Sequence, residues 1–140
     1  LDGYTSALAE HGIETDPELI TEGDITTSGG YAQTISLLKR PNRPTAIFAG
    51  SDLQAMGVYE AARQLGLRNP EELSVVGFDD VQTAAFLGPA LTTVRQPLQD
   101  MARAAVRMLV EALSTDDVIQ PHIIMPTSLV VRNSTQQLEG

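Results

Sequence analysis

SVVGFDD, residues 74–80, is the stretch from which the fold can be inferred. Val75 and Val76 lead through a glycine and an aromatic residue into two carboxylates, Asp79 and Asp80. A continuous apolar run of this kind is typical of a strand that is buried on both faces, as in a parallel sheet. We therefore expect a parallel strand that delivers two acidic side chains to the loop at its carboxyl end.

Outward from this strand, extended and helical segments alternate along the chain. The runs 45–50 and 91–96 are extended, and each is followed by a segment with apolar residues at helical spacing. The helix after the first run is expected to bury one stripe, made of Leu53, Met56, Gly57, Ala61 and Leu65. Two short strands, separated by Pro126, are expected to close the chain. This order predicts an α/β fold with a parallel sheet flanked by helices.

Composition excludes several classes of protein. The chain has 140 residues, the size of one domain, and its net charge of −9 at pH 7 would repel a nucleic-acid backbone or an anionic membrane. The sequence shows no apolar run long enough to span a membrane and no secretory leader, so we expect a soluble chain. Cysteine is absent, and His11 and His122 have no ligand spacing, so no metal site is expected.

Two of the expected strands end in polar residues. Ser51 and Asp52 follow the run 45–50, and Asp79 and Asp80 end the stretch quoted above. In open parallel sheets, ligands lie beyond the carboxyl ends of the strands. Each residue also has a structural interpretation, because Ser51 and Asp52 can cap or support the next helix, and the aspartate pair can stabilise a turn. Both interpretations remain open at this point.

An enzyme is the weaker interpretation of these residues. Adjacent side chains on an extended chain point in opposite directions, so only one of Asp79 and Asp80 is expected to face a crevice. A paired-carboxylate catalyst needs both groups to converge on one bond. Phosphate-binding glycine loops, GxSxG and HExxH are absent from the sequence, and nothing in it indicates a cofactor. The pattern favours reversible binding of a small polar molecule.

Four stretches together resemble one known family. They are RPTAIFAGSDLQAMGVYEAARQLGL (43–67), PEELSVVGFDD (70–80), ALTTVRQPLQDMARAAVRML (90–109) and MPTSLVVRNST (125–135). In order and spacing they resemble the C-terminal part of the effector-binding core of LacI/GalR (lac repressor) transcription regulators. The resemblance implies one incomplete lobe of a two-lobe, periplasmic-binding-protein-like domain. It divides the chain into a C-terminal lobe (1–96), a crossover helix that belongs to the other lobe (97–120) and closing strands with a tail (121–140).

The resemblance also implies roles for particular residues. Asp79 is expected to bind effector hydroxyls, while Asp80 stabilises the loop. Ser51 and Gln96 are expected to line the same crevice. Ile25 stands where the family commonly has an aromatic residue, and it offers contact area without the face of an aromatic ring. This departure argues against a flat ring held by stacking.

A mechanism and partners follow from the resemblance as expectations. Two lobes would close on a small effector, a sugar or, as the less favoured choice, a purine or nucleoside. Closure would control operator binding by an upstream helix-turn-helix domain in a cytoplasmic repressor. A homodimer is expected through Met56, Tyr59, Phe86 and Leu87, although core packing explains Met56 equally well. The alternative function is that of a periplasmic sugar-binding protein of a transporter.

Overall fold

A four-stranded sheet forms the centre of the molecule. The computed structural model describes residues 1–114 and 122–137. The strands are β1 (Ala46–Phe48), β2 (Ser74–Asp79), β3 (Thr92–Arg95) and β4 (Ser128–Val130), in that spatial order. The first three are parallel, and β4 runs antiparallel to β3. The expected α/β fold with a mostly parallel sheet is therefore confirmed, and the carboxyl ends of β1, β2 and β3 meet at one edge.

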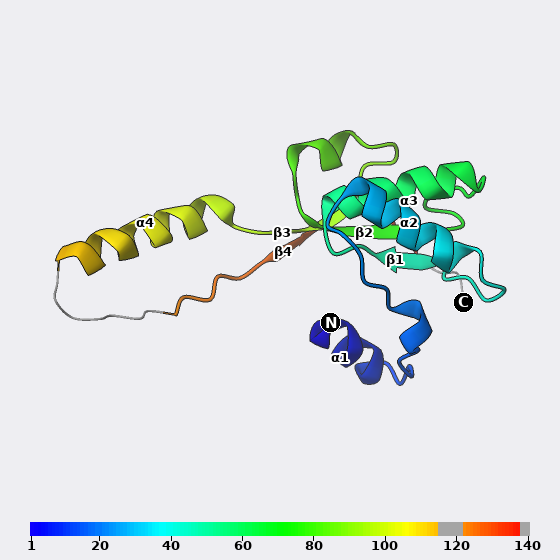
Figure 1. The fold of residues 1–140 in the computed structure, drawn as a ribbon, viewed down its shortest axis with the longest axis horizontal. Helices are drawn as coiled ribbons and strands as arrows, with labels where there is room; N and C mark the ends of the chain where they lie inside the picture. Colours follow the sequence, from blue (N-terminus) through cyan, green and yellow to red (C-terminus); the bar gives the residue numbers. More distant parts are fainter. Residues whose placement is uncertain (115–121, 138–140) are drawn as a thin grey trace.

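Two helices cover one face of this sheet. They are α2 (Thr27–Leu38) and α3 (Asp52–Gln64), and they lie side by side above the strands (Figure 1). The core between helices and sheet includes Leu73 and Val75, both fully buried. A Cβ atom on Gly57 would lie 2.1 Å from the Thr27 carbonyl oxygen, so the glycine lets α3 approach α2 closely.

The expected apolar stripe of α3 is only partly correct. Gly57 and Ala61 are buried, but Leu53 is 46% exposed and Leu65 is 37% exposed. The other buried residues of α3 are Ala55, Val58, Ala62 and the acidic Asp52. The helix α3 contacts the sheet on one side and α2 on the other. The buried part of its surface is therefore wider than one stripe and consists mostly of small side chains.

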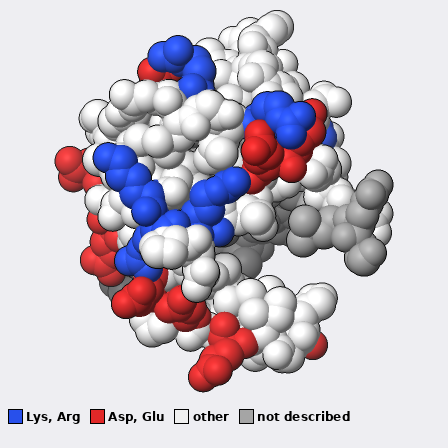
Figure 2. Space-filling model, turned by 90° about the vertical axis from the view of Figure 1, so that its right-hand side faces the viewer, with Lys and Arg blue, Asp and Glu red and all other residues white. Residues whose placement is uncertain are grey.

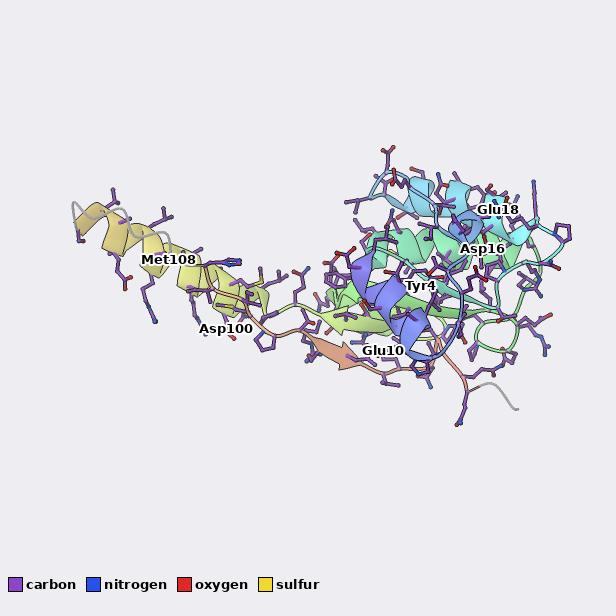
Figure 3. The ribbon with its side chains drawn as sticks, turned by 90° about the horizontal axis from the view of Figure 1, so that it is seen from below. Tyr4, Glu10, Asp16, Glu18, Asp100 and Met108 are labelled. Atoms are coloured by element: carbon purple, nitrogen blue, oxygen red, sulfur yellow. The ribbon has the colours of Figure 1, made fainter. Side chains whose placement is uncertain are left out.

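A short helix, α1 (Asp2–Glu10), lies on the other side of the sheet. It sits below the strands in Figure 1 and in front of them in Figure 3, where Tyr4 and Glu10 mark its course. None of its residues is buried. The helix ends just before Gly12, which adopts a positive φ of 69°.

The longest helix stands away from the rest of the molecule. The chain leaves the sheet through β3, forms α4 (Leu98–Ser114) and returns to the sheet through β4 (Figure 1). No residue of α4 is buried, and Figure 3 shows Asp100 and Met108 on a helix without neighbours from the body. Residues 122–127 form no strand, so of the two expected closing strands only β4 is present. The proposed boundary at 120/121 falls outside the described residues.

Candidate functional site

Side chains from the ends of β2 and β3 meet at the carboxyl edge of the sheet. Asp79 is the last residue of β2, and Gln96 is the first residue after β3. The Gln96 amide donates a hydrogen bond from Nε2 to Asp79 Oδ1 over 2.6 Å. Both side chains are half-buried, so each is held by the other while remaining open to a ligand. The structure thus brings together two of the residues that the sequence analysis singled out.

The backbone at Asp79 and Asp80 is unusual. Asp79 has φ 115° and Asp80 has φ 58°, both in the region that favours glycine. The chain is therefore not extended here, and the alternation expected of an extended strand does not apply. The two carboxylates nevertheless reach different partners, because Asp79 accepts from Gln96 while Asp80 accepts from two arginines. A strained backbone that is kept at a strand end is typical of binding sites.

Asp80 forms a cluster of opposite charges with Arg95 and Arg132. Its Oδ2 accepts from Arg95 Nε and its Oδ1 accepts from Arg132 Nη2, each over 2.6 Å. Burial of Asp80 would raise its pKa, but the hydrogen bonds from Arg132 and Arg95 outweigh this and hold the pKa below its usual range. Both oxygens of the Asp80 carboxylate therefore accept hydrogen bonds from arginine side chains. We refer to Asp80, Arg95 and Arg132 as the crossing cluster.

Ser51 lies at the same edge of the sheet as the N-cap of α3. Its Oγ accepts a hydrogen bond from the Gln54 backbone N–H over 3.1 Å, and the residue is buried. This is the capping role that the sequence left open. A hydroxyl that accepts a bond keeps its own hydrogen to donate, so capping and contact with a ligand are compatible.

Asp52 has a role that the sequence analysis missed. It lies in the first turn of α3, but its carboxylate does not cap the helix. Oδ1 accepts from the Thr93 hydroxyl over 2.6 Å, and Oδ2 accepts from the Val81 N–H over 2.8 Å. This fully buried acid therefore joins α3 to β3 and to the loop after β2. Gly77 is the sequence signal that points to it, because a Cβ there would lie 2.3 Å from Asp52 Oδ1.

Ile25 lies in the loop before α2 and is 71% exposed. The Gln54 side chain donates from Nε2 to the carbonyl oxygen of Asp24 over 3.1 Å. This bond ties the Ile25 loop to the first turn of α3, next to Ser51. Ile25 thus offers an exposed apolar surface near the first turn of α3.

The four residues expected at a dimer interface differ in their surroundings. Phe86 is 80% exposed at the end of a short 3-10 helix, Gln82–Phe86, while Leu87 packs against the core. Met56 is half-buried on α3. The Tyr59 hydroxyl donates to the carbonyl oxygen of Pro89 over 2.8 Å. Burial raises the pKa of Tyr59 to about 12, against a smaller lowering by the Ser134 hydroxyl.

Two hollows are present on the surface of the described residues. One, of about 700 Å³, is lined by α2 and α3 and contains none of the predicted ligand residues. The other, of about 720 Å³, runs between α4 and residues 122–127 and is lined largely by apolar side chains. Gln96 lines this second groove as well as bonding Asp79. The residue therefore lies at the junction between the strand-end site and α4.

Charges of both signs lie together on the end of the molecule that points away from α4 (Figure 2). Exposed ion pairs of this kind include Arg63 with Glu60 and Arg68 with Glu72. Such a surface does not offer the continuous basic face that a phosphate backbone requires. Within residues 1–114 and 122–137, no cluster of side chains is suited to hold a metal ion.

Comparisons with known proteins identify the family. Residues 1–135 match the family model of the periplasmic binding protein-like domain. The chain is 41% identical over 134 residues to the HTH-type transcriptional regulator MalR of Clostridium butyricum, and 38% identical over 138 residues to the repressor CytR of Escherichia coli K12. The alignments cover 96% and 99% of this chain. The chain belongs to the LacI family of transcription regulators.

Solved structures agree with this membership. The transcriptional regulator CelR in complex with cellobiose has a TM-score of 0.90 at 36% identity, over 94% of this chain and 40% of that one. A LacI family regulator from Enterococcus faecium with bound ribose has a TM-score of 0.89 at 27% identity, over 98% of this chain and 50% of that one. The expected fold, part of a periplasmic-binding-protein-like core, is therefore confirmed.

The LacI-family chain described here is shorter than its relatives. It spans about 40% of the length of the curated relatives MalR and CytR. Those relatives are named as transcription regulators, which is consistent with the expectation that this chain is not an enzyme. In the part of the chain that the structure describes, no helix has the length and apolarity needed to cross a membrane.

Proposed function

We propose that the chain is the effector-sensing part of a DNA-binding transcriptional repressor. The observation that carries the proposal is the Asp79–Gln96 pair at the carboxyl edge of the parallel sheet. A carboxylate and an amide that hold each other in place present fixed acceptors and donors to a ligand. Family membership supports the regulatory role, since the relatives MalR and CytR are named as a transcriptional regulator and a repressor, and the solved regulator CelR shares this fold.

A neutral sugar is the effector class that this site fits best. Asp79 has a second carboxylate oxygen, and Gln96 a carbonyl oxygen and a second N–H, all of which can bond hydroxyl groups. Ser51 adds a hydroxyl, and Ile25 adds an apolar surface for the carbon face of a ring. Arg95 and Arg132 balance the charge of Asp80, whereas Asp79 bonds the neutral amide of Gln96, so its negative charge would repel a phosphate. A purine or nucleoside is the second choice, because Ile25 cannot stack as an aromatic ring would.

The mechanism we propose uses the two segments that connect the sheet to α4, one leaving through β3 and one returning through β4. Effector bound at Asp79 and Gln96 would fix the segment that leads directly into α4. In a two-lobe core, α4 would pack on the other lobe, so effector binding changes the angle between the lobes. A homodimer of such cores in the cytoplasm would then present upstream helix-turn-helix domains at a changed spacing to operator DNA. Effector and operator affinities are thereby coupled by about 1–3 kcal/mol.

Two other functions are less well supported. A glycosidase-type enzyme would need two free carboxylates, but both oxygens of Asp80 are bound to arginines. A periplasmic sugar-binding protein of a transporter would share the fold, and the matched family model is consistent with it. The curated relatives named above are helix-turn-helix regulators, which favours the repressor.

The test is an effector screen on the full-length protein that carries this chain. Melting temperature is measured with neutral mono- and disaccharides, sugar phosphates, purines and nucleosides. An effector at 100 times its Kd adds about 2.7 kcal/mol of stability, or several degrees in Tm. We expect a neutral sugar to give this shift, and a compound-induced change of about 5- to 150-fold in affinity for a DNA fragment from upstream of the protein's own gene.

Two variants show whether Asp79 is responsible. Asp79→Asn keeps the shape of the side chain, and asparagine accepts the positive φ of this position. The variant should abolish the sugar-induced shift in Tm while leaving the Tm without ligand unchanged. Asp2→Asn neutralises an exposed carboxylate on α1 and should keep the full shift. If Asp79→Asn binds undiminished, the assigned site is wrong. Sugar binding without any change in DNA affinity would contradict the repressor.

A further inference from the structure

The crossing cluster joins the two segments that connect α4 to the sheet. Arg95 is the last residue of β3, through which the chain leaves for α4, and Arg132 follows β4, through which it returns (Figure 1). Asp80 directly follows β2 and bonds both arginines. One carboxylate therefore holds the outgoing and the returning segment at the base of α4.

The two arginines differ in how firmly they are held. The Arg132 side chain is 18% exposed and also donates from Nη1 to the Leu91 carbonyl oxygen over 2.7 Å. Its backbone N–H donates to the Thr92 hydroxyl over 2.9 Å. The Arg95 side chain is 56% exposed and bonds Asp80 through Nε. Arg132 is thus fixed to the sheet, whereas Arg95 is the more easily released of the two.

The cluster lies directly beside the proposed effector site. Asp79 and Asp80 are consecutive, and so are Arg95 and Gln96. Asp79 accepts from Gln96, and Asp80 accepts from Arg95, so two side-chain bridges join the same two segments one residue apart. A shift of the segment 95–96 must change both bridges together. The first residue of α4, Leu98, follows two residues after Gln96.

We propose that Asp80 is a positioning residue that couples the Asp79–Gln96 site to the orientation of α4. Its ion pairs fix residues 95–96 so that Gln96 is oriented before an effector arrives, and the same ion pairs set the direction of α4. The coupling to effector binding rests on the function proposed above, whereas control of α4 does not. Loss of the Asp80 charge should therefore loosen α4 and weaken effector binding together.

The orientation of α4 is measured by distances between two spin labels in the full-length protein. The chain has no cysteine, so labels can be placed at Ser36→Cys on α2 and Arg107→Cys on α4, both exposed; any cysteine elsewhere is replaced. Asp80→Asn suits the positive φ of this position. We expect it to widen the distance distribution at least about twofold, and to raise the effector Kd about tenfold, since it removes two charge-assisted hydrogen bonds.

Further variants separate positioning from general stability. Arg95→Met should reproduce both effects in part, and the double variant should be no worse than Asp80→Asn alone, because Arg95 acts through Asp80. Arg95→Lys keeps the charge and should restore part of both. Glu60→Gln removes an equally close carboxylate–arginine pair on α3 and should change neither the distances nor the Kd.

The outcomes distinguish this inference from the proposed function. An unchanged distance distribution in Asp80→Asn, or a lower Tm with distances and Kd unaltered, overturns the positioning role. If Asp80→Asn does not fold, Arg95→Met at an exposed position provides the same test. If none of the compounds binds the unaltered protein, the proposed function fails, and the label distances alone decide whether Asp80 controls α4.

Discussion

Asp52 and Gly77 form a matched pair in the core. A buried carboxylate is unfavourable unless hydrogen bonds replace its water, and the Thr93 hydroxyl and the Val81 N–H do so here. The carboxylate occupies the space that a side chain on residue 77 would need. Gly77 is therefore required by its neighbour and not by its own backbone angles.

Gly77→Ala should destabilise the protein by about 3 kcal/mol, because the new methyl group displaces a carboxylate held by two hydrogen bonds. Urea unfolding measures the effect, and the slope m should be unchanged. Gly3→Ala is the matched control, since a Cβ there meets nothing within 4 Å and the helix α1 tolerates alanine. A loss below about 0.5 kcal/mol for Gly77→Ala would show that the Asp52 carboxylate can move freely.

Tyr59 gives a prediction about pH. Its pKa is raised from 10.0 to about 12, so the folded state holds the phenol proton more tightly than the unfolded state does. The stability from Tyr59 is therefore complete below pH 10 and is lost as the pH rises from 10 through 12. Ultraviolet titration should show one tyrosinate step near pH 12 that is absent in Tyr59→Phe and present in Tyr4→Phe. A titration unchanged by Tyr59→Phe would contradict the assignment.

Among the elements, α3 shows why helical periodicity was an incomplete guide. The spacing of Leu53, Met56 and Leu65 indicated one buried stripe, yet Leu53 and Leu65 are exposed. An alanine-rich helix has several stripes of small residues, and the approach of α2 at Gly57 selects among them. That contact joins residues far apart in the sequence, so local spacing carried no sign of it.

The helix α4 has an apolar face that residues 122–127 cover only in part. Leu109 is 64% exposed and Leu113 is 88% exposed. For this 140-residue chain, Leu109→Lys with Leu113→Lys should lower the fluorescence of an apolar dye at least about twofold, because the exposed apolar patch is the dye site. Gln99→Lys with Ser114→Lys adds the same charge and should have little effect. Equal fluorescence in both variants would mean that the dye binds elsewhere.

At the scale of the whole molecule, the interface residues yield a test of assembly. We expect a dimer at micromolar concentration in which Phe86 contributes apolar contact, since it is 80% exposed. Phe86→Ser should raise the dimer dissociation constant about tenfold or more by sedimentation equilibrium. Phe48→Ser removes another exposed phenylalanine, 55% exposed on β1, and should leave the constant unchanged. A monomeric mass for the unaltered chain would contradict the predicted dimer.

The sequence predicted the α/β order and the polar strand ends because both leave local patterns. An apolar run that ends in Ser51 or Asp79 can be recognised from a few consecutive residues. The bonds from Asp52 to Thr93 and from Asp80 to Arg132 span 41 and 52 residues, and no local pattern reports them. The same limit explains the missing second closing strand, because pairing with β3 decides which part of 122–130 becomes extended.

The antiparallel pairing of β3 with β4 has a mechanical consequence. Thr93, Val94 and Arg95 lie opposite Val130, Leu129 and Ser128, so the two connections to α4 form one narrow ribbon. A two-stranded ribbon resists bending within its own plane but accommodates a large twist about its length. The easiest movement of α4 relative to the sheet is therefore torsional, because both strands turn together about the length of the ribbon. Such a turn changes the direction in which the apolar face of α4 points while moving the helix itself little.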